Sequence, residues 1–268
     1  MRILLTGSTG FIGRYLKQHL KHDVITPTSK DINLLDLNSV TDFLKAQQFD
    51  AVIHCAVVGR ESVYAINPKI AEDNLRMFYN LALNKEHFDK FINFGSGAEF
   101  GLDQDIELAY EDAIDYIVPN ESYGFSKNII TRSIRKTPNF FNLRIFACLD
   151  PSESSTRFVT KFKNTVAEGN KFFIDKDRYI DFITLADITL VVEAILAEDI
   201  IEQDINLVYQ DKLMASELLT KYCKLHGIDP TLIVVTGHGK NYTGDGTRLA
   251  KCELPLEGID ATLKRYKD

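Results

Sequence analysis

The first half of the chain alternates short apolar runs with helical hydrophobic patterns, and this alternation limits the fold more than any other feature. Strand-like runs cover residues 2–6, 24–26, 51–58, 91–94 and 140–148, and helical patterns cover residues 11–20, 40–46, 68–84 and 123–135. An apolar run such as 51–58 is typical of a strand that is buried on both faces. Strands that alternate with helices form right-handed βαβ units and a parallel sheet. The sequence therefore predicts an α/β protein with a doubly wound parallel sheet.

Composition narrows the class of protein. The 268 residues suffice for one large domain with a smaller lobe, and the net charge of −7 disfavours nucleic acid or an anionic membrane as the main partner. The four cysteines show no CxxC spacing, and the six histidines show no metal-ligand clustering, so we expect free thiols and no metal. No apolar run is long enough to span a membrane, and no leader is recognisable at the N-terminus. We therefore expect a cytoplasmic protein.

A glycine-rich segment, TGSTGFIG at residues 6–13, lies between the first predicted strand and the first predicted helix. Gly7 allows the tight turn, Gly10 allows backbone N–H groups to approach a pyrophosphate, and Gly13 allows close packing of helix and strand. The helix N-terminus then faces the phosphates. This pattern predicts a Rossmann-type dinucleotide site, with Gly7, Thr9, Gly10, Phe11, Ile12, Gly13 and Arg14 as its residues.

After Pro151 the strand and helix patterns become shorter and mixed. Strands are predicted near 172–174, 180–183 and 205–209, and helices near 157–168, 185–197 and 215–225. We expect residues 1–150, joined by 180–203, to form the dinucleotide-binding domain. Residues 151–179 and 204–268 would form a smaller mixed α/β lobe that binds substrate at the carboxyl edge of the sheet.

The end of the second predicted strand bears on the choice of cofactor. NAD-binding folds place an Asp or Glu there for the ribose hydroxyls, whereas this chain has Thr28, Ser29 and Lys30. Hydroxyls and a cation suit a 2′-phosphate, and Arg14 could add a second cation, so NADP(H) is preferred. The alternative is NAD(H), with Asp31 or Asp36 supplying the acid and Lys30 in solvent.

A second motif, YGFSK at residues 123–127, places Tyr123 and Lys127 at positions i and i+4 of a predicted helix. Side chains at this spacing share a helix face, so the ammonium can favour ionisation of the phenol. A tyrosine in that setting can transfer a proton to or from an alcohol oxygen. Ser96 lies between two glycines after the fourth predicted strand, where its hydroxyl could hydrogen-bond the same oxygen.

Together these motifs resemble the extended short-chain dehydrogenase/reductase family, and within it the nucleotide-sugar epimerases and reductases. The resemblance covers roughly the first 200 residues. It implies that Ser96, Tyr123 and Lys127 are catalytic and that the substrate is a nucleotide sugar. The resemblance implies that Gly7, Gly10, Gly13 and Ala56 contact the cofactor. The full set of predicted cofactor contacts also includes Ser29, Lys30, Tyr123 and Lys127. The predicted substrate contacts are Ser96, Glu99 and Arg178. Arg178 would meet a nucleotide phosphate, with a structural salt bridge as the alternative. A homodimer through residues 66–84 and the Tyr123 helix is the expected assembly.

Departures from the family pattern narrow the reaction. Family dehydratases carry an Asp–Glu pair after the catalytic hydroxyl residue, where this chain has Gly97 and Ala98. Ala98 also replaces the cysteine of the fucose-type epimerase-reductases. Two activities remain, reduction of a 4-keto-6-deoxy nucleotide sugar by NADPH and NAD-dependent 4-epimerisation, and the missing ribose acid favours reduction. A third alternative, an NADP-binding regulatory protein without activity, is disfavoured because Tyr123 and Lys127 are both present.

Overall fold

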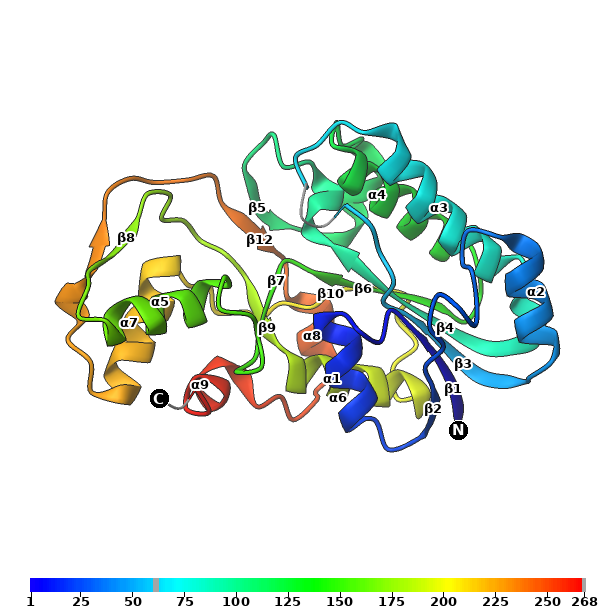
Figure 1. The fold of residues 1–268 in the computed structure, drawn as a ribbon. Coiled ribbons are helices and arrows are strands. Elements are labelled where there is room, and N and C mark those ends of the chain that lie inside the picture. Colours follow the sequence, from blue (N-terminus) through cyan, green and yellow to red (C-terminus); the bar gives the residue numbers. More distant parts are fainter. Residues whose placement is uncertain (60–62, 267–268) are drawn as a thin grey trace.

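The computed structural model describes residues 1–59 and 63–266, and over these residues a parallel sheet of six strands forms the centre of the molecule (Figure 1). The strand order is β2-β1-β3-β4-β6-β10. The strands are β1 (Arg2–Thr6), β2 (Asp23–Ile25), β3 (Phe49–His54), β4 (Phe88–Ser96), β6 (Phe140–Ile145) and β10 (Asp204–Asn206). The order reverses between β1 and β3, and open α/β sheets bind ligands at the carboxyl ends of the strands beside such a switch point. The predicted doubly wound parallel sheet is confirmed.

Helices cover both faces of the sheet (Figure 1). Helices α1 (Phe11–His19), α6 (Leu185–Leu196) and α8 (Thr247–Lys251) contribute Leu16, Val191 and Leu249 to the apolar core on one face. Helices α2 (Leu37–Lys45), α3 (Pro68–Ala82) and α4 (Ser122–Ile134) contribute to a second apolar core on the other face. Burial on both faces agrees with the buried apolar residues of the central strands, such as Ile3, Ile53 and Phe91. None of the helices in the described ranges is both long and apolar enough to cross a membrane.

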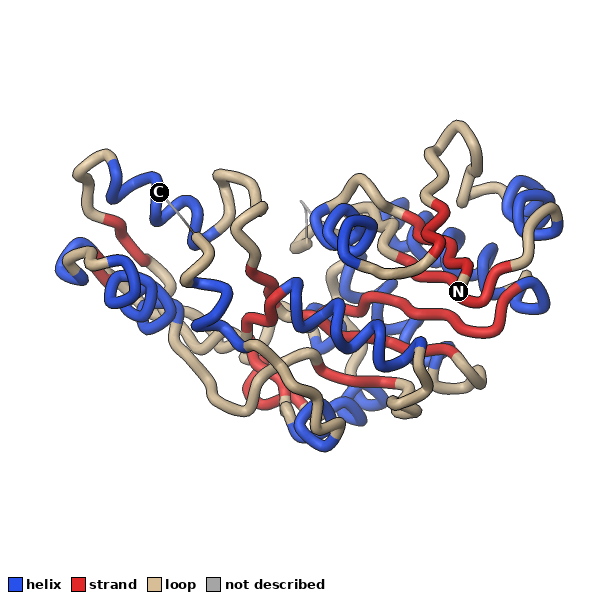
Figure 2. The backbone as a smooth tube through the Cα atoms, turned by 90° about the horizontal axis from the view of Figure 1, so that it is seen from below, coloured by secondary structure: helices blue, strands red, loops and turns tan. Residues whose placement is uncertain are grey.

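A smaller lobe lies beside the sheet and holds the C-terminal helix, whereas the N-terminus lies in the sheet (Figures 1 and 2). It has its own apolar core, which includes Phe162, Phe172 and Tyr222. Its elements are β7 (Ala147–Leu149), α5 (Phe158–Ala167), β8 (Phe172–Ile174), β9 (Phe182–Thr184), α7 (Ala215–His226), β11 (Ile233–Val235) and α9 (Gly258–Leu263). Strand β7 pairs with β9, and β8 pairs with β11.

A further short pair of strands connects this lobe to the sheet. Strand β5 (Ile106–Ala109) pairs in parallel with β12 (Tyr242–Gly244). Short 3-10 helices occupy Lys85–His87, Gly97–Phe100, Glu111–Tyr116 and Pro230–Leu232. The division into two units stays a prediction. Strand β10 lies within the range predicted for the lobe, but it is the sixth strand of the sheet.

Several predicted elements have different limits. The strand predicted at 51–58 ends at His54, because the side chain of Asn74 pairs with the backbone N–H and C=O of Val58 at 2.9 and 3.1 Å in place of a neighbouring strand. The strand predicted at 140–148 is two strands, β6 and β7, which pair in different sheets. Helix α2 begins earlier than predicted, and Asp36 caps it by accepting from the N–H groups of residues 38 and 39.

Candidate active site

The glycine-rich segment that joins β1 to α1 leaves no room for a side chain at Gly7 or Gly13. Gly7 has a φ of 67°, and a Cβ there would lie 2.5 Å from the backbone nitrogen of Ala56. A Cβ on Gly13 would lie 2.3 Å from the carbonyl oxygen of Gly7. Helix α1 is preceded by Gly10, carries no side-chain cap and has no acidic residue in its first turn. Its first N–H groups and its dipole are thus available for an anion, as a pyrophosphate cradle requires.

A cavity of about 1050 Å³ runs from this loop along the carboxyl edge of the sheet toward the lobe. It brings together most of the residues that the sequence singled out. Its lining includes Gly7, Thr9, Gly10, Phe11, Ile12, Gly13, Arg14, Ala56, Ser96, Tyr123, Lys127 and Arg178. Residues distant in the chain thus meet in one site of a size suited to a cofactor and a substrate together.

Lys127 lines this cavity and is almost fully buried. Its Nζ donates to the carbonyl oxygen of Phe94 at 2.7 Å. Burial lowers the pKa of Lys127 to about 8, although the charges of Glu99 and Cys55 act in the opposite direction. Tyr123, one helical turn earlier, is also buried and lines the same cavity. A lysine whose charge is this sensitive to its surroundings is a common feature of active sites.

Ser96 ends β4 and caps the 3-10 helix that follows. Its Oγ accepts from the N–H of Ala98 at 3.2 Å, and its own N–H donates to Glu99 Oε1 at 2.8 Å. This reciprocal capping fixes the Ser96 backbone and holds the hydroxyl at the carboxyl edge of the sheet.

His54, at the end of β3, is a buried neutral residue. Its Nδ1 shares a hydrogen bond of 2.8 Å with Thr6 Oγ1. Burial first and the nearby Lys127 second lower the pKa of His54 to about 3. The imidazole therefore carries no charge at neutral pH and adds no positive charge to the site.

The prediction that Glu99 contacts substrate is wrong. Its side chain is 0% exposed and points into the interior, where Oε2 accepts from Arg144 Nε at 2.7 Å and from Thr131 Oγ1 at 3.0 Å. Arg144 pairs in turn with Asp204 at 3.0 Å. Glu99 is thus part of a buried ionic cluster behind Ser96, and it supports that residue from within.

The end of β2 leaves the cofactor prediction open. Ser29 and Lys30 are exposed on the loop after β2 and are not among the residues that line the cavity. Arg14 does line the cavity, and its guanidinium donates to the carbonyl oxygen of Ser152 at 3.2 Å. The two alternative acids are both engaged locally. Asp31 accepts from the N–H and Oγ1 of Thr28, and Asp36 caps α2.

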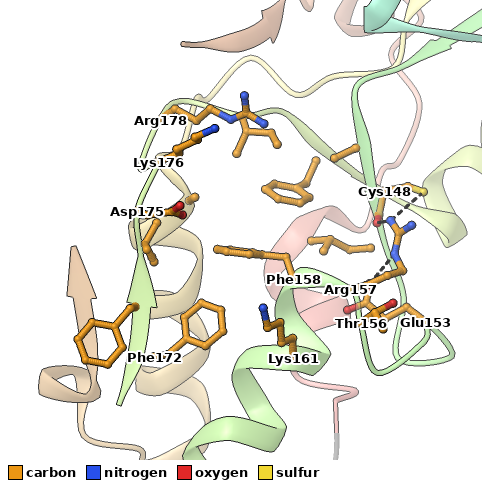
Figure 3. Close-up of a pocket in the computed structure, with 17 residues that line it drawn as sticks. Cys148, Glu153, Thr156, Arg157, Phe158, Lys161, Phe172, Asp175, Lys176 and Arg178 are labelled. Carbon is orange, nitrogen blue, oxygen red and sulfur yellow. Dashed lines mark hydrogen bonds and ion pairs between the residues drawn. The ribbon is translucent and has the colours of Figure 1, made fainter. Parts of the chain in front are cut away.

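Arg178 lies where the cavity meets a second hollow, of about 490 Å³, in the lobe. Arg178 forms no ion pair with any residue that the structure describes, so the structural salt bridge that was the alternative is not found among these residues. Its guanidinium lies 5.9 Å from the ring centre of Tyr242. In Figure 3, Lys176 and Arg178 lie on one side of the hollow and Arg157 on the other, with Phe158 between them. Cations around an aromatic side chain suit a ligand that carries phosphates and a planar ring.

Arg157 and Tyr242 are among the cavity-lining residues that the sequence analysis did not predict. Arg157 lines both hollows, with its guanidinium 4.5 Å from the ring centre of Phe11. Tyr242, on β12, lines the large cavity beside Ser96. Each is an isolated residue outside any local motif, and the tertiary fold alone brings it to the site.

The chain matches the family model described as "NAD dependent epimerase/dehydratase family" over residues 3–207. It is 34% identical over 137 residues to GDP-L-colitose synthase of Yersinia pseudotuberculosis, a match that covers 47% of this chain and 44% of the relative. It is 28% identical over 159 residues to GDP-L-fucose synthase of Azorhizobium caulinodans, covering 55% and 51%. The chain thus spans about half the length of these curated relatives.

Solved structures share the fold over nearly the whole chain. The dTDP-4-dehydrorhamnose reductase of Bacillus anthracis, in complex with NADP, superposes with a TM-score of 0.80 at 14% identity, covering 99% of this chain and 96% of that one. The UDP-glucose 4-epimerase of Thermotoga maritima, with UDP-glucose, gives 0.78 at 18% identity, covering 98% and 96%. At such identities the likeness shows the fold.

Proposed function

Since this chain belongs to the NAD-dependent epimerase/dehydratase family, we propose that it reduces a 4-keto-6-deoxy nucleotide sugar with NADPH. One observation carries the proposal. A single cavity holds the glycine-rich loop, then Ser96, Tyr123 and Lys127, and then Arg178 at the entrance to the lobe. This order provides room for a dinucleotide, a reacting sugar and a nucleotide diphosphate in a line.

The residues around the glycine loop fit a dinucleotide. The close packing at Gly7 and Gly13 and the uncapped start of α1 form an anion cradle from backbone N–H groups. We propose NADP(H) as the preferred cofactor and NAD(H) as the alternative, because Arg14 lines the cavity and both nearby carboxylates are engaged in local turns. When bound, this cofactor supplies a hydride to the sugar carbon.

The lobe side of the cavity supports a nucleotide-sugar substrate. Arg178 and Arg157 line both hollows. The Arg178 guanidinium can pair with a diphosphate that extends from one hollow into the other, whereas Arg157 is already paired with Glu153 at 3.1 Å. The ring of Phe158 offers a surface for the base. The names of the two curated relatives favour a GDP-linked sugar as the first substrate to test.

The reaction needs one proton at the carbonyl oxygen of the sugar. Tyr123 donates that proton as negative charge develops on the oxygen, and Ser96 donates a hydrogen bond to the same oxygen. Lys127, buried one turn from Tyr123, favours the phenolate that remains after proton transfer. Ala98, at 1% exposure, offers no group for a second proton transfer at a ring carbon, in agreement with simple reduction.

The test is a turnover assay with purified protein, NADPH and GDP-linked 4-keto-6-deoxy sugars. We expect stoichiometric loss of NADPH absorbance and formation of the 4-hydroxy sugar. Tyr123→Phe should abolish this loss, whereas Tyr116→Phe, on an exposed tyrosine, should leave it unchanged.

Two results would replace the proposal. Interconversion of two hydroxy sugars without net NADPH consumption would establish a 4-epimerase, the activity named for one of the solved structures of this fold. Tight NADPH binding without turnover of any sugar would establish a regulatory protein.

A further inference from the structure

The buried carboxylate of Glu99 contacts two different elements of the proposed site. Its Oε1 accepts from the backbone N–H of Ser96, at the end of β4, at 2.8 Å. Its Oε2 accepts from the hydroxyl of Thr131, on α4, at 3.0 Å. Helix α4 also carries Tyr123 and Lys127. A single carboxylate therefore joins the strand that ends in Ser96 to the helix that holds the other two proposed catalytic residues.

Thr131 lies on the face of α4 that carries the proposed catalytic pair. Tyr123, Lys127 and Thr131 follow one another at intervals of four positions, and neighbours at this spacing share a helix face. Lys127, the middle member, donates from Nζ to the carbonyl oxygen of Phe94 on β4 at 2.7 Å, so this face of α4 is turned toward β4. The hydrogen bond from Thr131 to Glu99 is a second tie on the same face.

The segment that follows Ser96 also packs directly on α4 through its backbone. A Cβ on Gly124, near the start of α4, would lie 2.3 Å from the carbonyl oxygen of Ala98, so the two backbones approach too closely for a side chain there. Asn128 donates from Nδ2 to the carbonyl oxygen of Glu99 at 3.0 Å. The glycine of the YGFSK motif thus allows α4 to contact the segment that carries the Glu99 carboxylate.

Arg144, on β6, fixes the orientation of this carboxylate. Its Nε donates to Glu99 Oε2 at 2.7 Å, the same oxygen that accepts from Thr131. The other guanidinium nitrogens donate to Asn206 Oδ1 at 2.9 Å and to Asp204 Oδ2 at 3.1 Å. The side chains of Glu99 and Arg144 are both 0% exposed. The carboxylate therefore lies at a fixed point where β4, β6 and α4 meet.

We propose that Glu99 is a positioning residue, whose carboxylate holds Ser96 in register with Tyr123. The inference rests on the proposed function, which requires the hydroxyls of Ser96 and Tyr123 to reach one sugar oxygen from two different elements. Glu99, Thr131 and Arg144 are not among the described residues that line the cavity. Their effect on turnover therefore passes through the residues that they hold in place.

Thr131→Val tests this role with a small change. It removes the hydroxyl that ties the carboxylate to α4, and it leaves the contacts of Glu99 with Ser96 and Arg144 in place. A misplacement of about 1 Å can lower a rate about 10²-fold, so we expect the smaller displacement here to lower kcat about tenfold. The KM and the Kd for NADPH should change little, because Thr131 contacts neither ligand.

Two variants accompany this measurement. Thr131→Ser retains a hydroxyl and should restore most of the lost kcat. The matched control is Thr220→Val on α7, whose hydroxyl donates within its own helix to the carbonyl oxygen of Ser216 at 2.9 Å, and it should leave kcat unchanged. A Thr131→Val protein as fast as the wild type, or a Thr131→Ser protein as slow as Thr131→Val, would overturn the inference.

A kinetic double-mutant cycle separates positioning from a loss of structure. In a Ser96→Ala background there is no serine hydroxyl to align with Tyr123, so Thr131→Val should cost less in kcat than it does in the wild type. A purely structural defect would lower kcat by the same factor in both backgrounds. Equal factors would therefore refute the positioning role of Glu99.

A second cycle, without substrate, tests the tie between Glu99 and α4. Urea unfolding of the wild type, Glu99→Gln, Thr131→Val and the double variant gives the four free energies of unfolding. Because both single changes weaken the same hydrogen bond, the loss in the double variant should be smaller than the sum of the single losses. Additive losses would overturn the inference. A protein that reduces no keto sugar but shows this coupling would refute the proposed function and leave the Glu99–Thr131 tie supported.

Discussion

Replacement of Glu99 by glutamine tests whether the ionic cluster behind the proposed site stabilises the fold. Glu99 Oε1 accepts from the Ser96 N–H at 2.8 Å, and Oε2 accepts from Arg144 Nε at 2.7 Å. An amide has one acceptor oxygen, so in Glu99→Gln its NH₂ group must face one of these two donors. The substitution also removes one of the two negative charges beside the buried guanidinium of Arg144, which keeps Asp204.

The expected cost follows from this geometry. Removing one partner of a buried ion pair typically costs about 3–5 kcal/mol, because the other charge stays buried. Glutamine preserves the volume and Asp204 still pairs with Arg144, so we expect the lower end, about 3 kcal/mol. With an m-value of about 3 kcal/mol per molar urea for a chain of this size, the unfolding midpoint should fall by about 1 M.

Urea denaturation followed by far-ultraviolet circular dichroism measures this shift. The matched control is Glu107→Gln on β5, which changes the same functional groups at an exposed position and should stay within about 0.5 kcal/mol of the wild type. If the two variants unfold at the same urea concentration, the Glu99–Arg144 pair contributes nothing to stability and our account of it fails.

Three further predictions concern the cofactor and the proton. Tyr123→Phe should lower kcat by at least about 10²-fold while the Kd for NADPH, measured by fluorescence titration, hardly changes; a kcat near that of the wild type would remove Tyr123 as the acid. Burial holds the pKa of Lys127 at about 8, below the 10.5 of an exposed lysine. The unfolded chain therefore binds this proton more tightly than the folded protein does. The folded state loses stability as the pH falls from 10.5 through 8, by up to about 3 kcal/mol. Lys127→Met should therefore raise Tm more at pH 7 than at pH 10, and equal changes at the two pH values would contradict the lowered pKa. If Arg14 and the exposed Lys30 bind the 2′-phosphate as the sequence predicts, Arg14→Ala and Lys30→Ala should each weaken NADPH binding about tenfold with little effect on NADH, because each would remove a charge-assisted bond. Calorimetric titration that finds equal losses for both cofactors would place neither residue at the ribose.

Much of the sheet could be predicted because its signals are local. Strand β1 and helix α1 follow apolar patterns of the expected period, and glycine is required at residue 13 because a Cβ there would lie only 2.3 Å from the carbonyl oxygen of Gly7. The Tyr123–Lys127 spacing also needed only one turn of helix, and α4 supplies it. These features depend on residues that are close together in the sequence, so they could be predicted from the sequence alone.

The misses involve partners distant in the chain. Glu99 was predicted to contact substrate, yet its orientation is set by Arg144, 45 positions later. Tyr242 carried no local signal, and its place in the cavity depends on the pairing of β12 with β5. The run 140–148 has the pattern of one continuous strand, but only the partners β4 and β9 reveal that it divides between two sheets.

The pairing of β5 with β12 also affects when the cavity can form during folding. The βαβ units of the sheet join segments that are close in sequence, whereas Ile106 pairs with Tyr242, across more than half of the chain. Contacts of such high sequence separation require the closure of a long loop before they gain any energy, so they form late. During synthesis the N-terminal segments emerge and fold first. The glycine-rich loop can thus reach its final shape early, while the wall of the cavity that carries Tyr242 closes only after β12 has been made and has found β5.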